Sequence, residues 1–328
     1  MSIAKYPDIF DELKAEVRAA GLLERVPVRG SFEMMAILLS MALVYYATFN
    51  WSALNVPVWA PFAFGLFMTV VFTRAVFVSH DILHLQYFKK KTLSFDLSYP
   101  FSALILSNSS SWWDFKHNIN HHTWCNVPEK DEDINAMDGA FTQKRKGNKA
   151  WLRATKYLVF WGSMFFMYFA FIVQSYNFAI KRKLWGELAL MLAHWPLVWG
   201  VIFYFLPFAD ALTVFLVLNF TLSPWLAFGF ITNHLGCEVI DKVDSESLTW
   251  MELQMRTSRS LTGGALVHWF YGGLNTQIEH HLFPKAPRFN LLKVQKMTRD
   301  FAKKHNVHYF ETTPLRAYVQ INDVLKEY

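Results

Sequence analysis

Long apolar runs alternate with polar stretches along the chain, and the lengths of these runs predict helices that cross a membrane. A bilayer core about 30 Å thick needs about 20 apolar residues in a helix. Basic residues flank one run, 157–176, on both sides, and since basic flanks favour the cytosol, we expect that run to be membrane-embedded or interfacial without crossing. The other four runs are predicted to be transmembrane helices: residues 32–51, 58–79, 184–206 and 211–231.

The loops between these runs predict the orientation. Residues 52–57 contain no Lys or Arg, so this loop is expected on the non-cytosolic side and the N-terminus in the cytosol. Residues 80–156 and 232–328 then form a cytosolic cap within a single domain that covers residues 1–328. Residues 8–25 are predicted to be an amphipathic helix that lies along the membrane surface, because one stripe holds its apolar residues Ile9, Phe10, Leu13 and Val17. The expected fold is an all-α integral membrane protein with four transmembrane helices, interfacial helices and a cap.

Composition supports a membrane protein and excludes several other classes. The 328 residues are 53% hydrophobic, with a mean hydropathy of +0.16. Two cysteines, Cys125 and Cys237, are too few for a disulfide framework or a Cys-rich zinc or iron–sulfur site, so we expect both to be reduced and to face the cytosol. The net charge of +6 is explained by positive cytosolic loops. Nucleic acid is not expected as a partner, because the sequence has no basic domain with interleaved surface aromatic residues.

Histidines are concentrated at the ends of the predicted membrane helices. Twelve are present, and eight fall in short groups on the predicted cytosolic side. The spacing of four residues in "HDILH" and in "HNINHH" places two imidazoles on one helix face, and Gln277 precedes the pair in "QIEHH" by one turn. The eight are His80, His84, His117, His121, His122, His234, His280 and His281.

Eight imidazoles on one side of a membrane predict two metal ions. Neutral imidazole binds borderline metals, and a structural zinc ion takes four ligands. Histidine ligands suit iron, zinc, copper or nickel, and the spacing does not choose among them. The zinc-protease motif HExxH needs a glutamate where this chain has Asp81, so a protease is disfavoured. His194 is expected to bond a backbone carbonyl freed by Pro196, and His305 and His308 are expected to be solvated.

At these residues the sequence resembles the membrane fatty acid desaturases, and more narrowly their front-end branch, whose third histidine box begins with Gln. The matching motifs are "HDILH" (80–84), "HNINHH" (117–122) and "GGLNTQIEHHLFP" (272–284). The resemblance implies four membrane helices and a cytosolic cap around two iron ions (Fe²⁺/Fe³⁺), held by the eight histidines, which are then also the catalytic residues. It also implies that Gln277 is a weak ligand and that His268 either supports a ligand or substitutes for one.

The second box departs from the commoner pattern, because three residues rather than two separate its first histidine from its pair. The stretch "TWCNVPEKDEDIN" follows it. Asp131 and Asp133 in this stretch either hold ligand histidines or belong to a solvated acidic loop, and both interpretations stay open. Asp81 and Glu279 are adjacent to expected ligands, but neighbours in a helix usually point away from each other.

The resemblance implies a dioxygen-dependent fatty acyl desaturase. An acyl hydroxylase or an acetylenase on the same site is the alternative, and a metal-ion carrier, from another class, would need histidines at mid-bilayer depth. The acyl substrate, on phospholipid, coenzyme A or acyl carrier protein, needs an apolar tunnel that the spans and "WFYGGLN" (269–275) are able to line. Because no dinucleotide motif and no HPGG haem motif of a fused cytochrome b5 domain is present, an external ferredoxin or cytochrome b5 is expected as electron donor. The expected location is a bacterial inner membrane or the endoplasmic reticulum, with the catalytic face in the cytosol.

Overall fold

A computed structural model describes residues 9–137 and 150–327, and the described chain is almost entirely helical. It forms two compact units, which are described separately below. Unit 1 comprises residues 1–25, 115–161 and 229–328, and unit 2 comprises residues 26–114 and 162–228. The basic flank at Arg145, Lys146 and Lys149, and the first residue of the predicted 8–25 helix, lie outside the described residues.

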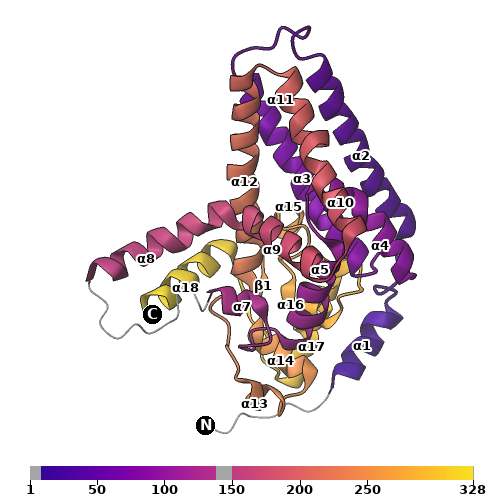
Figure 1. Ribbon diagram of the computed structural model, residues 1–328. Helices are drawn as coiled ribbons and strands as arrows, with labels where there is room; N and C mark the ends of the chain where they lie inside the picture. Colours follow the sequence, from indigo (N-terminus) through magenta and orange to yellow (C-terminus); the bar gives the residue numbers. More distant parts are fainter. Residues whose placement is uncertain (1–8, 138–149, 328) are drawn as a thin grey trace. The chain divides into compact units, whose positions relative to one another are not determined.

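Unit 2 consists of long apolar helices joined by shorter ones, and α2, α3, α11 and the first part of α12 run side by side in it (Figure 1). α12 continues into unit 1. The elements are α2 (Pro27–Phe49), α3 (Ala60–Leu83), α4 (Lys91–Tyr99), η1 (Pro100–Ile105), α5 (Ser110–Trp113), η4 (Met164–Phe166), α9 (Met167–Lys181), α10 (Trp185–His194), η5 (Trp195–Gly200), α11 (Val201–Phe205) and α12 (Phe208–His234).

Five helices of the described chain are long and apolar enough to span a membrane: Pro27–Phe49, Ala60–Leu83, Thr155–Lys181, Trp185–Phe205 and Phe208–His234. Four of them contain most of the four runs predicted to be transmembrane helices. The fifth, Thr155–Lys181, contains the 157–176 run, which is therefore a long helix. Length and composition do not distinguish a crossing helix from an embedded one, so the expectation that this run does not cross stays a prediction.

The second candidate span extends beyond its apolar run and carries the first histidine box. α3 begins with Pro61 in its first turn, where the missing N–H of proline leaves no hydrogen bond unmade. It continues past Ser79 to Leu83, because "HDIL" contains no residue that breaks a helix. His80 therefore lies in the last turn of α3, and His84 caps it.

Two π-helical segments interrupt the helices of unit 2 where prolines remove backbone donors. η1 begins at Pro100, and η5 contains Pro196. The buried His194, just before η5, has Nδ1 3.0 Å from the carbonyl oxygen of Leu104 in η1. The predicted bond to a backbone carbonyl is thus present, but the carbonyl belongs to the segment after Pro100 and is not one freed by Pro196.

Unit 1 consists of short helices and one pair of two-residue strands. The strands β1 (Ser260–Leu261) and β2 (Glu311–Thr312) run parallel, with Ser260 opposite Glu311. The helices are α1 (Phe10–Ala19), η2 (Asp114–His121), α6 (His122–Trp124), α7 (Glu132–Met137), α8 (Ala150–Ser163), α13 (Lys242–Ser245), α14 (Trp250–Thr257), α15 (Gly264–Phe270), α16 (Gln277–Leu282), η6 (Arg288–Asn290), α17 (Leu291–His305) and α18 (Pro314–Glu327).

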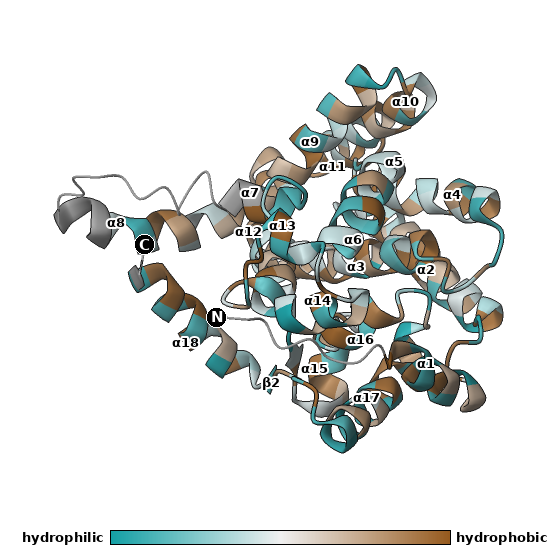
Figure 2. Cartoon of the chain, turned by 90° about the horizontal axis from the view of Figure 1, so that it is seen from below, coloured by the Kyte–Doolittle hydropathy of each residue, from teal (hydrophilic) through white to brown (hydrophobic). Residues whose placement is uncertain are grey.

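The apolar stripe of α1 packs into the core of unit 1. Leu13 and Val17 are fully buried in a cluster with residues of α14, α16 and α17, and Ile9 and Phe10 pack against the same cluster. Figure 2 shows α1 and α17 as neighbours, and the hydrophilic residues of α17 lie on the side away from this core. The predicted 8–25 helix is present but ends earlier, at Ala19, and the expectation that its stripe faces the membrane surface is wrong, because protein covers that stripe.

Candidate metal centre

The second histidine box lies on a π-helix, and this geometry decides which histidines come together. η2 ends at His121, and α6 begins at His122. A π-helix pairs residues five apart, so His117 and His122 share one face. Their Nε2 atoms are 3.3 Å apart, and Nε2 of His280 on α16 is 3.1 Å from that of His122. These three residues form what we call the 117/122/280 cluster.

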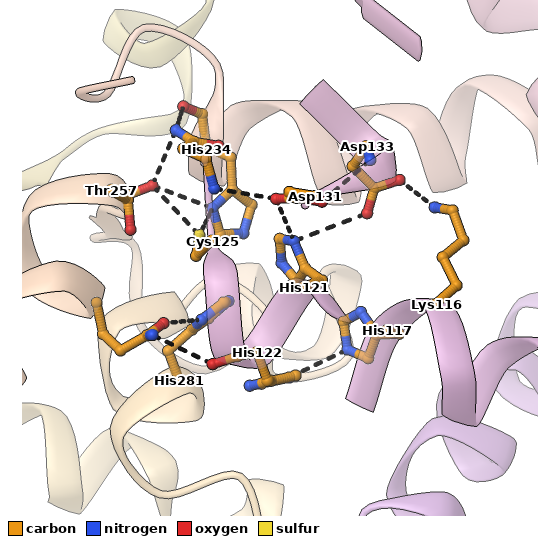
Figure 3. A network of polar contacts seen from close by, with 12 residues as sticks. Lys116, His117, His121, His122, Cys125, Asp131, Asp133, His234, Thr257 and His281 are labelled. Atoms are coloured by element: carbon orange, nitrogen blue, oxygen red, sulfur yellow. Dashed lines mark hydrogen bonds and ion pairs between the residues drawn. The ribbon is translucent and has the colours of Figure 1, made fainter. Parts of the chain in front are cut away.

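A second group of three imidazoles lies beside the first. The ring centroids of His121, His234 and His281 are 4.7, 4.9 and 5.0 Å from one another. We call this group the 121/234/281 cluster, and Figure 3 shows its three rings. Metal–nitrogen bonds of about 2.1 Å give separations of this order between rings that share one ion. Each adjacent pair, 121 with 122 and 280 with 281, contributes one histidine to each cluster.

Gln277 is buried beside two imidazoles of the 121/234/281 cluster. Its amide nitrogen is 2.8 Å from Nε2 of His234 and 3.2 Å from Nε2 of His281, while its amide oxygen accepts a 3.4 Å hydrogen bond from Asn233. An amide N–H donates only to an unprotonated ring nitrogen, so both Nε2 atoms present lone pairs. The side chain is therefore within reach of any ion held by these two histidines.

The other ring nitrogen of each histidine in the 121/234/281 cluster faces a hydrogen-bond acceptor. Nδ1 of His121 is 2.9 Å from a carboxylate oxygen of Asp131, and Nδ1 of His281 is 2.6 Å from the amide oxygen of Gln254. Nδ1 of His234 is 3.2 Å from the carbonyl oxygen of Thr257. Protons on Nδ1 leave Nε2 unprotonated, which is the tautomer that binds a metal through Nε2.

The charges around this cluster favour an ionised Asp131: burial opposes protonation of His121, but the charge and hydrogen bond of Asp131 raise the pKa of its imidazole. Burial opposes ionisation of Asp131, but the charge of His121 and its hydrogen bond hold the pKa of that carboxyl well below its usual range. Burial, together with the neighbouring histidines, lowers the pKa of His281 well below its usual value, so its ring stays neutral. Asp131 is 1% exposed. Of the two interpretations of Asp131, the one in which it holds a ligand histidine therefore agrees with its contacts.

Asp133 and Cys125 lie at the edge of the same cluster. Asp133 is 3.8 Å from Nδ1 of His121, and it forms an ion pair with the buried Lys116. Sγ of Cys125 is 3.3 Å from Nδ1 of His234, on the side of the ring away from Gln277, and burial raises the pKa of its thiol well above the usual value. Cys125 is a free, protonated thiol placed to support His234 through Nδ1.

The first box lies in unit 2, where the imidazoles of His80 and His84 face each other. The ring centroids of His80 and His84 are 4.4 Å apart, as expected for residues four apart on one helix face. Nδ1 of His80 is 3.2 Å from the buried carboxylate of Asp81, which in turn lies 3.0 Å from the hydroxyl of Tyr87. Asp81 therefore contacts the imidazole of its neighbour, despite the tendency of adjacent helix residues to point apart.

Other polar residues singled out in the sequence have different surroundings. Nδ1 of His268 is 2.9 Å from the amide oxygen of Asn275, and its Nε2 is 2.9 Å from the carbonyl oxygen of Arg288. Glu279 accepts hydrogen bonds from Ser260 and Tyr309, and burial raises the pKa of its carboxyl to about 7. These hydrogen bonds join Glu279 to residues that are not expected ligands.

The two histidines of the polar tail differ from each other. His308 is exposed, as expected. The expectation of a solvated side chain is wrong for His305, because its ring lies 4.2 Å from that of Phe301 and its Nε2 is 3.3 Å from Glu12. The imidazole is therefore half-buried beside Phe301 and Glu12.

Three supporting residues could not be recognised from the sequence: Gln254, Thr257 and Arg259, which lie on α14 or just after it. Arg259 is fully buried and donates hydrogen bonds to the carbonyl oxygens of Thr232 and Leu235, at the end of α12 that carries His234. Thr257 acts through its backbone carbonyl, which any residue supplies. A Gln or Arg in a short polar stretch normally indicates a solvated helix face.

Unit 2 also contains a mostly apolar pocket that reaches His80. It encloses about 400 Å³ of empty space, part of it open to solvent. Phe171 lies 5.5 Å from Trp112 and 6.0 Å from Trp113 between ring centroids, so three aromatic rings form one wall. Residues 269–275, expected to line a tunnel, are not among its lining residues, which are Val76, Ser79, His80, Leu83, Ser102, Leu106, Asn108, Ser109, Trp112, Trp113 and Phe171.

Comparison with known proteins points to one family. The family model for fatty acid desaturases matches residues 57–313. The chain is 29% identical, over 98% of its length, to Acyl-lipid (9-3)-desaturase of Physcomitrium patens. It is 26% identical, over 93% of its length, to Delta(6)-fatty-acid desaturase fat-3 of Caenorhabditis elegans, and 27% identical, over 83%, to Fatty acid desaturase 3 of Homo sapiens. The matches span 63%, 71% and 62% of these relatives, respectively.

Proposed function

The chain belongs to the fatty acid desaturase family, and on that premise we propose that it is a dioxygen-dependent desaturase that introduces a double bond into a fatty acyl chain. With five apolar helices of spanning length, it is a membrane protein. The observation that supports the proposal most directly is the pair of histidine clusters in unit 1, because the three imidazoles of the 121/234/281 cluster lie close together and each has Nδ1 facing an acceptor.

We propose that the eight histidines hold two iron ions. The donor set fits iron, because neutral imidazole is a ligand that iron accepts and the hydrogen bonds at Nδ1 fix the required tautomer. When bound, the ions would activate dioxygen, with two electrons and two protons from outside, to remove one hydrogen from each of two adjacent methylene groups, and both oxygen atoms would leave as water. His80 and His84 are included on the strength of the sequence motif, and Gln277 is proposed as a weak ligand. Both nitrogens of His268 already face acceptors, which favours a supporting role over ligation.

The residues of this chain have separate tasks in the proposal. Asp131, Gln254 and the carbonyl of Thr257 keep protons on Nδ1, so that Nε2 is available to the ion. The pocket lined by Trp112, Trp113 and Phe171 receives the acyl chain, because apolar and aromatic walls favour a hydrocarbon over water. His80 lines the same pocket, so an acyl chain bound there would lie next to a proposed metal ligand.

The partners and location are also proposed. The acyl substrate is carried on phospholipid, coenzyme A or acyl carrier protein, and the electrons come from a ferredoxin or a cytochrome b5. The membrane is a bacterial inner membrane or the endoplasmic reticulum, with the histidines on the cytosolic side. Four crossing helices, with Thr155–Lys181 embedded, keep every long polar segment on that side.

Expression in a host with a matched electron donor, followed by fatty acid profiling and iron analysis, tests the proposal. A new unsaturated fatty acid and iron in the purified protein are expected for the wild type. His281→Ala should abolish both, whereas the matched control His308→Ala, on the exposed histidine, should leave both unchanged. A hydroxylated or acetylenic product would show that the protein is a hydroxylase or an acetylenase instead of a desaturase. Protein that is free of iron and inactive would contradict the proposal.

A further inference from the structure

Gln254 occupies a position between the second and third histidine boxes, and we infer that it is a positioning residue that fixes His281 for metal binding. The inference rests on the proposed function. Gln254 is fully buried in α14. Its amide oxygen is 2.6 Å from Nδ1 of His281, and its amide nitrogen is 3.1 Å from the backbone carbonyl oxygen of His122.

The contact with His122 fixes the orientation of the Gln254 amide, and this orientation decides which atom faces His281. A backbone carbonyl only accepts, so the NH₂ group of Gln254 has to face His122. The amide oxygen then has to face His281, where it accepts a hydrogen bond from Nδ1–H. That bond leaves the lone pair on Nε2 of His281, which is the nitrogen that faces Gln277. The neutral side chain of Gln254 therefore sets the tautomer of His281 in the third box, because its own orientation is fixed by the backbone carbonyl of His122 in the second box.

The position of Gln254 is well defined by the packing of α14. The neighbouring Leu253 lies in a buried cluster with Val127 and Ile240, and Met255 lies in the main core of unit 1. The helix begins at Thr249, whose hydroxyl accepts a hydrogen bond from the backbone N–H of Glu252. Because both sides of the helix are fixed, the amide has little freedom to follow His281 if that ring turns.

Gln254 also differs chemically from the partner of His121. The carboxylate of Asp131 would hold a proton on Nδ1 through charge as well as geometry, whereas the amide of Gln254 acts by geometry alone. Replacement by leucine removes the acceptor and leaves Nδ1–H of a buried ring without its partner. Replacement by glutamate keeps an acceptor at the same distance along the side chain.

The test is a Co²⁺ titration of the metal-free, full-length protein, followed by the absorption of the bound ion. Gln254→Leu should bind Co²⁺ about 10- to 100-fold more weakly than the wild type. Gln254→Glu, which keeps the acceptor for Nδ1–H of His281 but loses the donor to His122, should recover part of that affinity. The matched control is Gln295→Leu, a buried glutamine of the same unit that bonds Glu311 and should retain wild-type affinity.

Thermal unfolding of the metal-free variants separates positioning from folding. Gln254→Leu is expected to unfold at a temperature close to that of the Gln295→Leu control while binding metal far more weakly. Wild-type affinity in Gln254→Leu, or an equal loss in both leucine variants, would overturn the inference and leave the proposed function intact. A wild-type protein that binds neither Co²⁺ nor Fe²⁺ would instead reject the proposed function, and the inference with it.

Discussion

The buried carboxylate of Asp131 shows how a single residue controls a proposed ligand. It accepts hydrogen bonds from Nδ1 of His121 and from the backbone N–H groups of Asn126 and Asp133. The backbone bonds hold the carboxylate in place, and its charge holds the proton on Nδ1. The available nitrogen of His121 is thus determined by the acidic stretch that follows the second box.

Asp131→Asn should weaken iron binding by about tenfold or more, because the amide keeps the shape of the side chain but loses the charge that strengthens the bond to Nδ1. Iron content after dialysis against a chelator series measures the effect. The matched control is Asp323→Asn on α18, whose carboxylate is 56% exposed. Full retention of iron in Asp131→Asn would show that the charge has no part in ligand binding.

The sequence predicted the histidines at the residue scale but not most of the residues that support them. Recurring pairs such as His121 and His122 are recognisable because imidazole is uncommon and its spacing carries geometric information. The role of Asp131 stayed open, since an acidic loop is usually solvated. Gln254 and the carbonyl of Thr257 gave no signal, because their roles depend on long-range packing of α14 that a local pattern does not contain.

At the scale of elements, the π-helix η2 explains how the second box tolerates its extra residue. Pairing of residues five apart brings His122 onto the face of His117, which residues four apart would share in an α-helix. The additional residue is absorbed by the wider turn. The unusual spacing in the sequence and the unusual helix in the structure are therefore one feature.

Deletion of Ile119, which is 50% exposed, should convert η2 into an α-helix and keep iron content close to that of the wild type. His117 and His122 would then be four residues apart on one face. Iron analysis and circular dichroism of the purified variant measure the outcome, with Ile119→Ala as the control that leaves the spacing unchanged. Loss of iron in the deletion but not in the control would contradict this explanation of η2.

The end of α12 depends on Arg259, which donates hydrogen bonds to Thr232 and Leu235 and to the side chain of Gln320. Arg259→Gln should destabilise the protein by about 3 kcal/mol, because buried acceptors lose a charged donor. Thermal unfolding in detergent measures this, with the exposed Arg316→Gln as control. Equal stability of the two variants would show that Arg259 is dispensable as a cap of the helix that carries His234.

The helices themselves were predicted with small errors at their ends. Apolar runs defined α2, α3, α12 and the continuous 185–205 helix, because a membrane-spanning helix needs a minimum apolar length. The run 58–79 ended too early, since the polar box that follows it is also helical. The orientation of α1 was mistaken because an amphipathic stripe shows that one face is covered but not whether lipid or protein covers it.

At the scale of the whole molecule, the proposed topology has an even number of crossings, which would keep the long polar segments on one side of the membrane. The predicted topology has residues 52–57 on the non-cytosolic side and the 182–183 turn in the cytosol. The five candidate spans do not decide the topology by themselves. If Thr155–Lys181 crossed the membrane, every later segment of the chain would lie on the opposite side from the one predicted. Hydropathy therefore predicted which segments are long enough to span the membrane, and only the distribution of basic residues predicted that an even number of them cross it.

Labelling with a membrane-impermeant maleimide tests the topology. In vesicles with the cytosolic face inside, Asn55→Cys should react, whereas Lys183→Cys should react only after permeabilisation, because both side chains are exposed and the proposed topology puts them on opposite sides of the membrane. The wild type sets the background, since Cys125 is buried and Cys237 is half-buried. Labelling of Lys183→Cys in intact vesicles would show that Thr155–Lys181 crosses the membrane.

The division of each adjacent histidine pair between the two clusters has a consequence for assembly of the centre. An ion that binds His121 and His281 also restrains the backbone from which His122 and His280 project. Binding of the first ion then bears the entropy cost of ordering these two segments, and binding of the second ion does not bear it again. Loading of the two ions should accordingly be cooperative, so that protein carrying a single ion is scarce during reconstitution.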